Sequence, residues 1–375
     1  MARRTSRELD CVIIGAGPAG LGTAIALTAI GGLTWTVVER GRIGQTFLDW
    51  PAEQRFLTPS FTGNGFGATD LNAVHPMTSP AFSLGVDYPD GPGYARYLGA
   101  VAEHFGIAVR SRTEVHRIHA EPRRFRLATS RGALRARTVV WAGGEFGDPG
   151  RPTFDGAELG QHASTEPAWA PRKGRVLVIG GYESGIDLAC HQIGHGAEVT
   201  VVDPEHPWDA RQGSDPSFLL APRTRQRLRT AQQTGRLTLI GTARITELAA
   251  LDDGRYRART STGTELITDS APIVATGYGS GLGPASPLFA RRPDGWPLVD
   301  ANDESTTTPG VFLAGAGLRH DQLRFCFIYK FRQRFAQVAR TVADRLGRDA
   351  SALEYWRSAG MWTDDLSCCG TECAC

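Results

Sequence analysis

The C-terminal end of the 375-residue chain concentrates its most reactive side chains. Four of the seven cysteines fall within the last eight residues, at Cys368, Cys369, Cys373 and Cys375. Several thiolates on one short segment can bind a soft cation such as Cu(I) or Zn²⁺, and a neighbouring pair can exchange with a disulfide. The acidic Asp364, Asp365 and Glu372 disfavour thiolates by repulsion but attract a cation. The tail is therefore a candidate thiol redox centre or metal site, and a tail without a chemical role is the alternative.

A glycine-rich loop near the N-terminus has the spacing of a dinucleotide-binding turn. The apolar run Leu9–Ile14 predicts a buried strand, Gly15-Ala16-Gly17-Pro18-Ala19-Gly20 follows it, and a helix-compatible stretch continues to Ile30. The first glycine permits the tight turn, the second lets a pyrophosphate approach the backbone, and the third lets the helix pack on the strand. The helix N-terminus supplies partial positive charge to the phosphates.

Side chains after the next strand complete this predicted site. The strand Trp35–Val38 ends at Glu39, whose carboxylate can accept a hydrogen bond from an adenosine ribose hydroxyl. We also assign cofactor contacts to two loop residues and to three residues that follow the acid, namely Pro18, Ala19, Arg40, Gln45 and Thr46.

A second unit of the same kind begins in the middle of the chain. Residues 175–179 predict a strand, a loop of sequence GGYESG follows at 180–185, and a helix extends to about His195. Tyr182 replaces the second glycine of the fingerprint and places a side chain where a pyrophosphate would approach. A Rossmann unit that binds no nucleotide is the alternative. We expect the second dinucleotide at Gly180, Tyr182, Glu183 and Ser184.

The acid of the second unit bears on the choice of nicotinamide cofactor. The strand Glu198–Val202 ends in Asp203, the position equivalent to Glu39. An arginine directly after the acid would hold a 2′-phosphate, but Pro204 and Glu205 follow instead. The sequence therefore favours NADH over NADPH.

The composition excludes several classes of protein. With 41% hydrophobic and 21% charged residues, the chain is typical of packed globular proteins of two or three domains. A net charge of +2 gives no broad attraction to polyanions, so a nucleic-acid partner is not expected. Residues 11–30 are uncharged, but their glycines and proline indicate strand, turn and helix, and no signal-peptide pattern precedes them. We expect a cytoplasmic protein without a membrane partner.

Three further segments, together with the two loops, resemble the two-dinucleotide-binding flavoproteins. VWAGG at 140–144 and IVATGY at 273–278 are similar to the two A-T-G turns of that superfamily, and Thr308–Gly315 is similar to the strand that presents the flavin. The chain most resembles the bacillithiol-disulfide-reductase-like group, beside thioredoxin reductases and flavin-containing monooxygenases. The resemblance implies an α/β fold of two Rossmann-like three-layer domains, an oxidoreductase activity, and FAD with NADH or NADPH as cofactors.

The resemblance also implies roles for individual residues. Gly15, Gly17 and Gly20 would hold the FAD pyrophosphate, and Glu39 the ribose. The backbone at Val115 would lie near the adenine and Gly315 near the isoalloxazine. The other implied cofactor contacts are Ala142, Gly143, Ala316, Thr276 and Gly277. Many relatives carry an aspartate at the position of Ala316, although the bacillithiol-type group also tends to lack it.

The order of these segments predicts an inserted domain. Residues 1–150 and 300–375 would form a discontinuous FAD domain, 151–285 the NAD(P)H domain, and 286–299 the return connection. The Pro/Gly-rich stretches 147–152 and 279–284 look like the hinges.

A long amphipathic helix is predicted from Leu323 to about Leu346. Apolar residues recur there at spacings of three and four, while Arg324, Arg332, Arg334 and Arg340 mostly fall on other positions. The resemblance directs the N-terminus of this helix at the pyrimidine edge of the flavin, where partial positive charge would stabilise reduced flavin.

The motifs that define reaction types among the relatives are missing or altered. The second unit has no C-x-x-C pair, and Ala19 stands where bacillithiol-type reductases carry a cysteine. The monooxygenase motif F-x-G-x-x-x-H is degenerate, because His162 comes two positions late, and we interpret His162 as an ordinary linker histidine. The aromatic stretches 44–51 and 55–61 form either a substrate pocket or a packed loop.

These observations support one main hypothesis and two alternatives. The segment Leu366-Ser367-Cys368-Cys369 resembles the C-terminal vicinal pair of mercuric reductases. The main hypothesis is therefore an FAD-dependent NAD(P)H oxidoreductase that passes electrons through the tail to a small disulfide or a thiol-bound metal ion. The alternatives are a flavin-dependent monooxygenase of a small molecule and a non-catalytic redox sensor or metal-trafficking flavoprotein. A tail that serves a partner subunit's flavin would require a homodimer.

Overall fold

The computed structural model describes residues 8–210 and 215–366, which form two compact units. Unit 1 comprises the chain up to Asp49, the segment Thr58–Asp148 and the chain from Ser280 onwards. Unit 2 comprises Trp50–Leu57 and Pro149–Gly279. The main boundaries fall in the two Pro/Gly-rich stretches, and the segment from Trp50 to Leu57 groups with unit 2 rather than with its neighbours in the chain.

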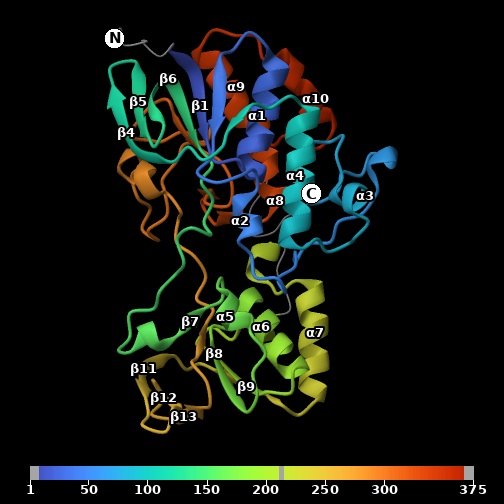
Figure 1. The fold of residues 1–375 in the computed structure, drawn as a ribbon. Helices are drawn as coiled ribbons and strands as arrows, with labels where there is room; N and C mark the ends of the chain where they lie inside the picture. The colour runs from blue at the N-terminus through green and yellow to red at the C-terminus, as the bar shows by residue number, and fades with distance from the viewer. Residues whose placement is uncertain (1–7, 211–214, 367–375) are drawn as a thin grey trace. The chain divides into compact units, whose positions relative to one another are not determined.

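Unit 1 is built on a mostly parallel sheet with helices packed against it (Figure 1). The strand order is β3-β2-β1-β6-β5-β4. The strand β15 pairs with the C-terminal part of β6, whereas β5 pairs with its N-terminal part. The strands of this sheet are β1 (Leu9–Ile14), β2 (Trp35–Val38), β3 (Val109–Arg110), β4 (Val115–Glu121), β5 (Arg124–Thr129), β6 (Gly132–Trp141) and β15 (Val311–Leu313). A separate two-stranded sheet is formed by β16 (Arg319–His320) and β17 (Leu323–Arg324). The helices of unit 1 are α1 (Pro18–Ile30), α2 (Gln45–Leu48), α3 (Pro80–Leu84), α4 (Gly91–His104), α8 (Ile328–Phe331), α9 (Phe335–Arg345) and α10 (Glu354–Ser358).

The core of unit 1 explains the apolar run of its first strand. Cys11–Ile14 are all buried, because β1 is paired on both sides by β2 and β6 and helices cover the sheet. Gly22 of α1 lies directly against the ring of Phe335 of α9, so a side chain at that position would collide with the neighbouring helix.

Unit 2 repeats the parallel arrangement in a smaller sheet. Its strand order is β10-β9-β8-β14-β7, and a separate antiparallel sheet is formed by β11-β12-β13. The strands are β7 (Gln161–His162), β8 (Arg175–Ile179), β9 (Glu198–Asp203), β10 (Leu237–Gly241), β11 (Ile245–Ala250), β12 (Tyr256–Thr260), β13 (Glu265–Thr268) and β14 (Ile273–Val274), and the helices are α5 (Glu166–Trp169), α6 (Glu183–Gly194) and α7 (Pro222–Gln233). The predicted α/β class with two Rossmann-like units is confirmed.

The predicted helix from Leu323 to Leu346 is wrong in its start and in its continuity. Leu323–Arg324 is strand β17, which pairs with β16, and the first helical turn α8 begins at Ile328. A 3₁₀ turn at Arg332–Arg334 lies between α8 and α9. The helix therefore begins five residues later than the apolar spacing suggested, and only its C-terminal part is regular.

Two arginines expected on the polar face are instead buried. Arg334 is 1% exposed and donates from Nε to Oδ2 of the fully buried Asp303 at 2.8 Å. Arg332 is 5% exposed and donates to the backbone oxygens of Asp70 and Ala73. Burial is tolerated because each guanidinium has hydrogen-bond acceptors inside the protein.

Candidate functional site

The three glycines of the first loop have two different structural roles. Gly15 has φ +108°, and a Cβ there would collide with the backbone oxygen of Ala142. A Cβ on Gly20 would collide with the backbone oxygen of Gly15. A Cβ on Gly17, by contrast, would find no atom within 4 Å. The fold thus requires Gly15 and Gly20, whereas Gly17 leaves open space beside the start of α1, as the approach of a pyrophosphate demands.

The carboxylate of Glu39 is held at the carboxyl end of β2, next to this loop. Oε2 accepts a hydrogen bond from the Ala16 N–H at 2.8 Å, and Oε1 accepts one from the Gly41 N–H at 2.8 Å. Glu39 is only 8% exposed, so its side chain is fixed. Each carboxylate oxygen keeps a second lone pair, with which it can accept from a ribose hydroxyl.

Other predicted contacts of the FAD site gather around the same loop. The Ala314 N–H donates to the Trp141 oxygen at 2.9 Å, which places the end of β15 beside the turn that contains Ala142 and Gly143. Gly315 has φ +109°, and a Cβ on it would lie 3.1 Å from the Cβ of Ala19. Gly315 and its neighbour Ala316 therefore lie next to the first loop.

Four further residues predicted for the FAD site are located less directly, by their burial and by the elements that carry them. The turn before α2 is tied to the loop, because the Gly44 N–H donates to the Ala16 oxygen at 3.0 Å. This tie brings the partly buried Gln45 and Thr46 close to the loop. Arg40 is exposed, and Val115 is buried at the start of β4.

The second loop repeats the geometry of the first. Gly180 has φ +102°, and a Cβ there would collide with the oxygen of Ala275, as Gly15 would with Ala142. A Cβ on Gly185 would likewise collide with the oxygen of Gly180. Asp203 Oδ2 accepts from the Gly181 N–H at 2.7 Å, the same backbone position that Glu39 binds in unit 1.

Tyr182 does not distort this loop. Its φ of −86° and ψ of −160° are close to the −85° and −171° of Gly17. Its hydroxyl donates to the backbone oxygens of Ser217 at 2.7 Å and Leu219 at 3.0 Å. The side chain is thus held by the segment that precedes α7, and the backbone conformation of the first loop is retained.

The other residues predicted for unit 2 have defined structural partners. Glu183 is buried at the start of α6 and accepts hydrogen bonds from the Ala221 N–H and, at 2.5 Å, from the Thr224 hydroxyl. Burial raises the pKa of the Glu183 carboxyl, and the hydrogen bond from Thr224 opposes this rise. The Thr276 hydroxyl donates to the Gly150 oxygen at 2.6 Å. Ser184 is partly buried in the first turn of α6.

His162 is occupied by structural contacts. Its Nε2 lies 3.1 Å from the oxygen of Gly277, and its Nδ1 lies 2.8 Å from the hydroxyl of Ser164. Burial lowers the pKa of His162, while the contact with Gly277 opposes this shift. With both ring nitrogens engaged, the histidine links β7 to the turn after β14.

Two residues near the loops were missed in the sequence. The ring of Trp208 lies directly against Gly181, so a Cβ on that glycine would collide with it and lie 3.0 Å from the Cβ of Asp203. Glu145 follows the turn after β6, where burial raises the pKa of its carboxyl to about 7 although the Arg319 guanidinium acts in the opposite direction. Trp208 comes five residues after the acid Asp203, and Glu145 directly follows the A-T-G-like turn. These positions in the sequence are the signals from which both residues could have been predicted.

The described cysteines do not supply a redox pair. Burial raises the pKa of Cys11 to about 12, and it raises that of Cys190 to about 12 as well. Cys326 lies in the connection between β17 and α8. The predicted catalytic and metal-binding Cys368, Cys369, Cys373 and Cys375 lie outside the described residues, and within residues 8–210 and 215–366 no cluster of three or more His, Cys, Asp or Glu is placed to hold a metal.

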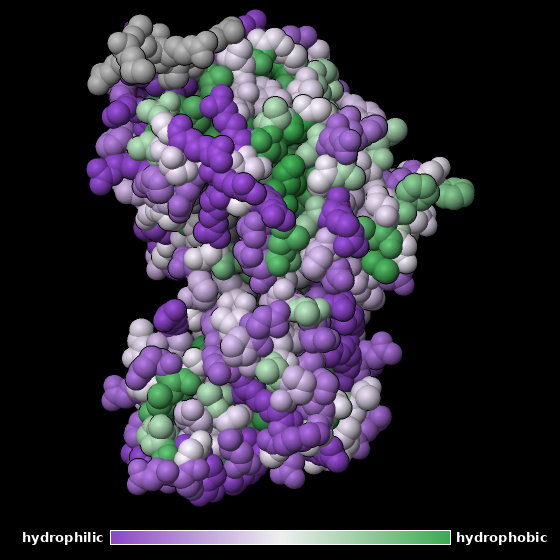
Figure 2. Space-filling view, viewed as in Figure 1, coloured by the Kyte–Doolittle hydropathy of each residue, from purple (hydrophilic) through white to green (hydrophobic). Residues whose placement is uncertain are grey.

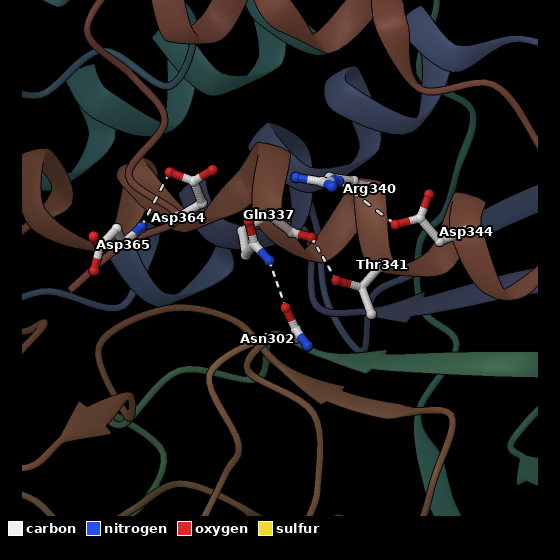
Figure 3. Close-up of a pocket in the computed structure, with 7 residues that line it drawn as sticks. All are labelled: Asn302, Gln337, Arg340, Thr341, Asp344, Asp364 and Asp365. Atoms are coloured by element: carbon white, nitrogen blue, oxygen red, sulfur yellow. Dashed lines mark hydrogen bonds and ion pairs between the residues drawn. The ribbon is translucent and has the colours of Figure 1, made fainter. Parts of the chain in front are cut away.

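A separate cavity of about 460 Å³ lies on unit 1 along α9 (Figure 3). The residues that line it are Asn302, Gln337, Arg340, Thr341, Asp344, Asp364 and Asp365. Several of these side chains bond one another, for example Gln337 Nε2 to Asn302 Oδ1 at 2.6 Å. The cavity contains no residue of either glycine loop, so it is not the dinucleotide site.

Comparison with known proteins agrees with the loop geometry. The family model described as pyridine nucleotide-disulphide oxidoreductase matches residues 12–315. The chain belongs to this family. It is an FAD- and NAD(P)H-dependent oxidoreductase, which confirms the predicted superfamily and the predicted enzyme class.

Individual relatives of this oxidoreductase carry different activities in their names. The ferredoxin–NADP reductase of Paramagnetospirillum magneticum is 27% identical over 334 residues, which cover 82% of this chain and 84% of the relative. A Baeyer–Villiger monooxygenase of Streptomyces coelicolor is 29% identical over 204 residues, 51% of this chain and 34% of that protein. The solved bacillithiol disulfide reductase of Staphylococcus aureus has a TM-score of 0.74 at 19% identity and covers 90% of this chain and 99% of that one. At 19% identity, the similarity to this structure is evidence for the fold alone.

None of the helices in the described residues combines the length and the apolar character that a membrane crossing requires.

Proposed function

We propose that unit 1 binds FAD, that unit 2 binds NADH, and that electrons pass from NADH to a small disulfide or a thiol-bound soft metal ion through the tail cysteines. The observation that carries the proposal is the doubled loop: two strand–loop–helix turns, each with a strand-end acid that accepts a hydrogen bond from the same loop N–H. When bound, FAD accepts a hydride and returns the electrons to an acceptor.

Unit 1 suits a negatively charged dinucleotide. The pyrophosphate would occupy the open space at Gly17, where the N-terminus of α1 provides partial positive charge. Glu39 would accept from the ribose hydroxyls, and Gly315 and Ala316 would line the other side of the loop. Residues Pro18, Ala19, Arg40, Gln45, Thr46, Val115, Ala142 and Gly143 complete the proposed site.

Unit 2 suits NADH better than NADPH. Asp203 carries the negative charge at the ribose end, and its Oδ1 already accepts from the Glu205 N–H at 2.8 Å. A 2′-phosphate would face this carboxylate and would meet no arginine directly after it. The loop contacts would come from Gly180, Tyr182, Glu183 and Ser184, with Thr276 and Gly277 at the end of β14.

The thiol step is assigned to the tail because four cysteines lie within its last eight residues, whereas burial keeps Cys11 and Cys190 protonated and Cys326 has no second cysteine near it in the sequence. A tail thiolate would attack the substrate disulfide and release one thiol, and a second tail thiol would resolve the mixed disulfide and release the other. Two electrons from NADH then reduce the tail disulfide. The balance is NADH, one proton and one disulfide converted to NAD⁺ and two thiols.

The experiment is stopped-flow reoxidation of the anaerobically reduced protein. We expect a model disulfide to reoxidise the wild-type protein rapidly, and we expect Cys368→Ser to slow this step strongly. The matched control is Cys190→Ser, which removes a thiol from α6 and should leave the rate unchanged. Equal rates in wild type and Cys368→Ser would refute the thiol relay while leaving FAD and NADH binding intact.

Oxygenation of a small molecule is the second candidate. It is supported by the identity to the Baeyer–Villiger monooxygenase. The structural role of His162 counts against a monooxygenase assignment of that residue. Oxygen uptake that is stimulated by a small substrate and yields an oxygenated product would favour this candidate over the thiol relay.

A further inference from the structure

The chain between α2 and α4, which we call the excursion, carries an exposed apolar surface that has no role in the proposed redox reaction. Phe66 is 97% exposed, Phe82 is 83% exposed and Met77 is 73% exposed. Phe61 and Val86, at the base of the excursion, are 47% and 44% exposed. We call these five side chains the apolar tip. Among the other described residues, no large apolar side chain is more than 42% exposed.

Hydrogen bonds bring the parts of the apolar tip together. Asn64 Nδ2 donates to the oxygens of Pro76 at 2.7 Å and Thr78 at 3.2 Å, which joins the turn of Phe66 to the segment of Met77. The Ser60 N–H donates to the Asp87 oxygen at 2.7 Å, which closes the base. The turn and α3 stand away from α4 in unit 1 (Figure 1), and green side chains gather on this projection (Figure 2).

A buried polar network anchors the excursion, so its exposed side chains are not those of a loose loop. Asp70 is fully buried, and its Oδ2 accepts from the Ser79 hydroxyl at 2.8 Å and the Ala81 N–H at 3.1 Å. Ser79 Oγ in turn accepts from the N–H of Phe82 at 3.1 Å and caps α3. The Arg332 guanidinium donates to the backbone oxygen of Asp70 and so connects the network to the turn before α9. The tip is therefore presented in a defined conformation.

The five side chains of the tip carry no charge. Asp70 is the only Asp, Glu, Lys or Arg in residues 56–86, and it is fully buried, whereas the next charged residue along the chain, Asp87, is exposed at the base directly after Val86. His75 is also buried, and burial lowers its pKa to about 4, so it is neutral near pH 7. An acidic protein or an anionic lipid surface is recognised by lysines and arginines, which this surface lacks.

We propose that the apolar tip is the contact surface between two copies of this chain. A two-fold contact sets a patch against itself, and an uncharged patch can do so without like-charge repulsion. Two exposed Phe rings can bury about 150–250 Å² each, a large part of the roughly 800 Å² per partner of a standard interface. Phe66 and Phe82 are therefore the expected anchors of the dimer.

Sedimentation equilibrium of the FAD-loaded full chain tests the surface. We expect the wild type to be dimeric at micromolar concentration and the double variant F66S/F82S to associate more weakly by about 100-fold or more. Leu298→Ser, which changes an apolar side chain that is 38% exposed outside the tip, should leave the dimer unchanged. A monomeric wild type, including one that binds phosphatidylcholine vesicles through the tip, would overturn the proposal, as would a dimer that survives F66S/F82S.

A charge exchange tests the self-contact itself. Phe66→Asp and Phe66→Lys should each be monomeric, because a two-fold contact brings like charges together. A mixture of the two variants should recover a heterodimer, because opposite charges then meet at the same contact. Failure of the mixture to associate would show that Phe66 does not meet the Phe66 of the second copy. Because all these changes are on exposed side chains, unchanged circular dichroism and FAD content serve as folding controls.

Discussion

The two glycine loops of this chain have nearly the same backbone, and of the three fingerprint glycines only one is replaced in the second loop. Gly15 and Gly20 in unit 1 match Gly180 and Gly185 in unit 2, and each would collide with a backbone oxygen if it carried a Cβ. Only Gly17 has a bulky counterpart, Tyr182. The comparison separates the fingerprint into positions that the fold demands and one position at which the fold accepts a side chain.

The largest expected effects fall on the fold positions. We expect Gly20→Ala and Gly185→Ala each to destabilise their own unit by about 3 kcal/mol or more, because the new methyl group meets a backbone oxygen. Gly17→Ala is the matched control and should cost about 1 kcal/mol or less. Urea denaturation measures all three, and similar free energies of unfolding for Gly17→Ala and Gly20→Ala would remove the distinction between the two kinds of glycine.

The ligand position should respond in binding and not in folding. We expect Gly17→Val to weaken FAD binding by about 100-fold, about 2.7 kcal/mol, because its side chain fills the space for the pyrophosphate. The far-ultraviolet circular dichroism should not change. Flavin fluorescence quenching measures the affinity, and FAD binding at wild-type strength would show that the pyrophosphate lies elsewhere.

The turns that follow the central strands β6 and β14 differ in whether they carry a titratable carboxyl. Glu145 in unit 1 has Tyr278 as its counterpart in unit 2. Burial raises the pKa of Glu145 from 4.5 to about 7, so the folded chain keeps a proton that the unfolded chain loses between these values. The stability of unit 1 should therefore fall as pH rises through this window, by about 1–3 kcal/mol.

Glu145→Gln isolates this contribution, because the neutral amide does not titrate. Urea denaturation at about pH 5 and pH 7.5 should give a smaller loss of stability for the variant than for the wild type. The same loss in both proteins would show that the Glu145 carboxyl titrates normally.

The two strand-end acids should have parallel but smaller effects. Glu39→Gln should weaken FAD binding and Asp203→Asn should weaken NADH binding by about tenfold each, because a charged acceptor of a ribose hydrogen bond becomes neutral. Asp203→Asn should also narrow the preference for NADH over NADPH. Steady-state kinetics with both nicotinamides measures this ratio, and an unchanged ratio would exclude Asp203 as the specificity residue.

The smallest effect is expected at Tyr182. Its hydroxyl bonds the segment before α7 and its backbone already has the conformation of Gly17. We therefore expect Tyr182→Phe to change the KM for NADH less than about threefold, since the net effect of losing the hydroxyl's hydrogen bond, shared between Ser217 and Leu219, is modest. A tenfold or larger change would mean that the hydroxyl contacts the cofactor.

Both loops and both acids could be predicted from the sequence because their requirements are local. A buried strand, glycines at fixed offsets and an acid at the end of the next strand all lie within about 30 residues. The same pattern marked Glu39 and Asp203, and the structure places each beside its loop.

The buried arginines could not be predicted, because their partners are distant in sequence. Arg334 pairs with Asp303, and Arg332 with the backbone at Asp70, both far in the sequence from the turn between α8 and α9 that carries the arginines. Helical periodicity assigns an arginine to the surface by default. The apolar tip was missed for the opposite reason, since a large apolar side chain such as Phe66 is normally expected inside.

Anaerobic titration of the FAD-loaded protein with NADH tests the account most directly. Two functional dinucleotide sites predict that one equivalent of NADH removes the visible absorbance of one bound flavin per chain, and that Asp203→Asn requires a higher NADH concentration to do so. A protein that binds FAD but is not reduced by NADH or NADPH would contradict the account.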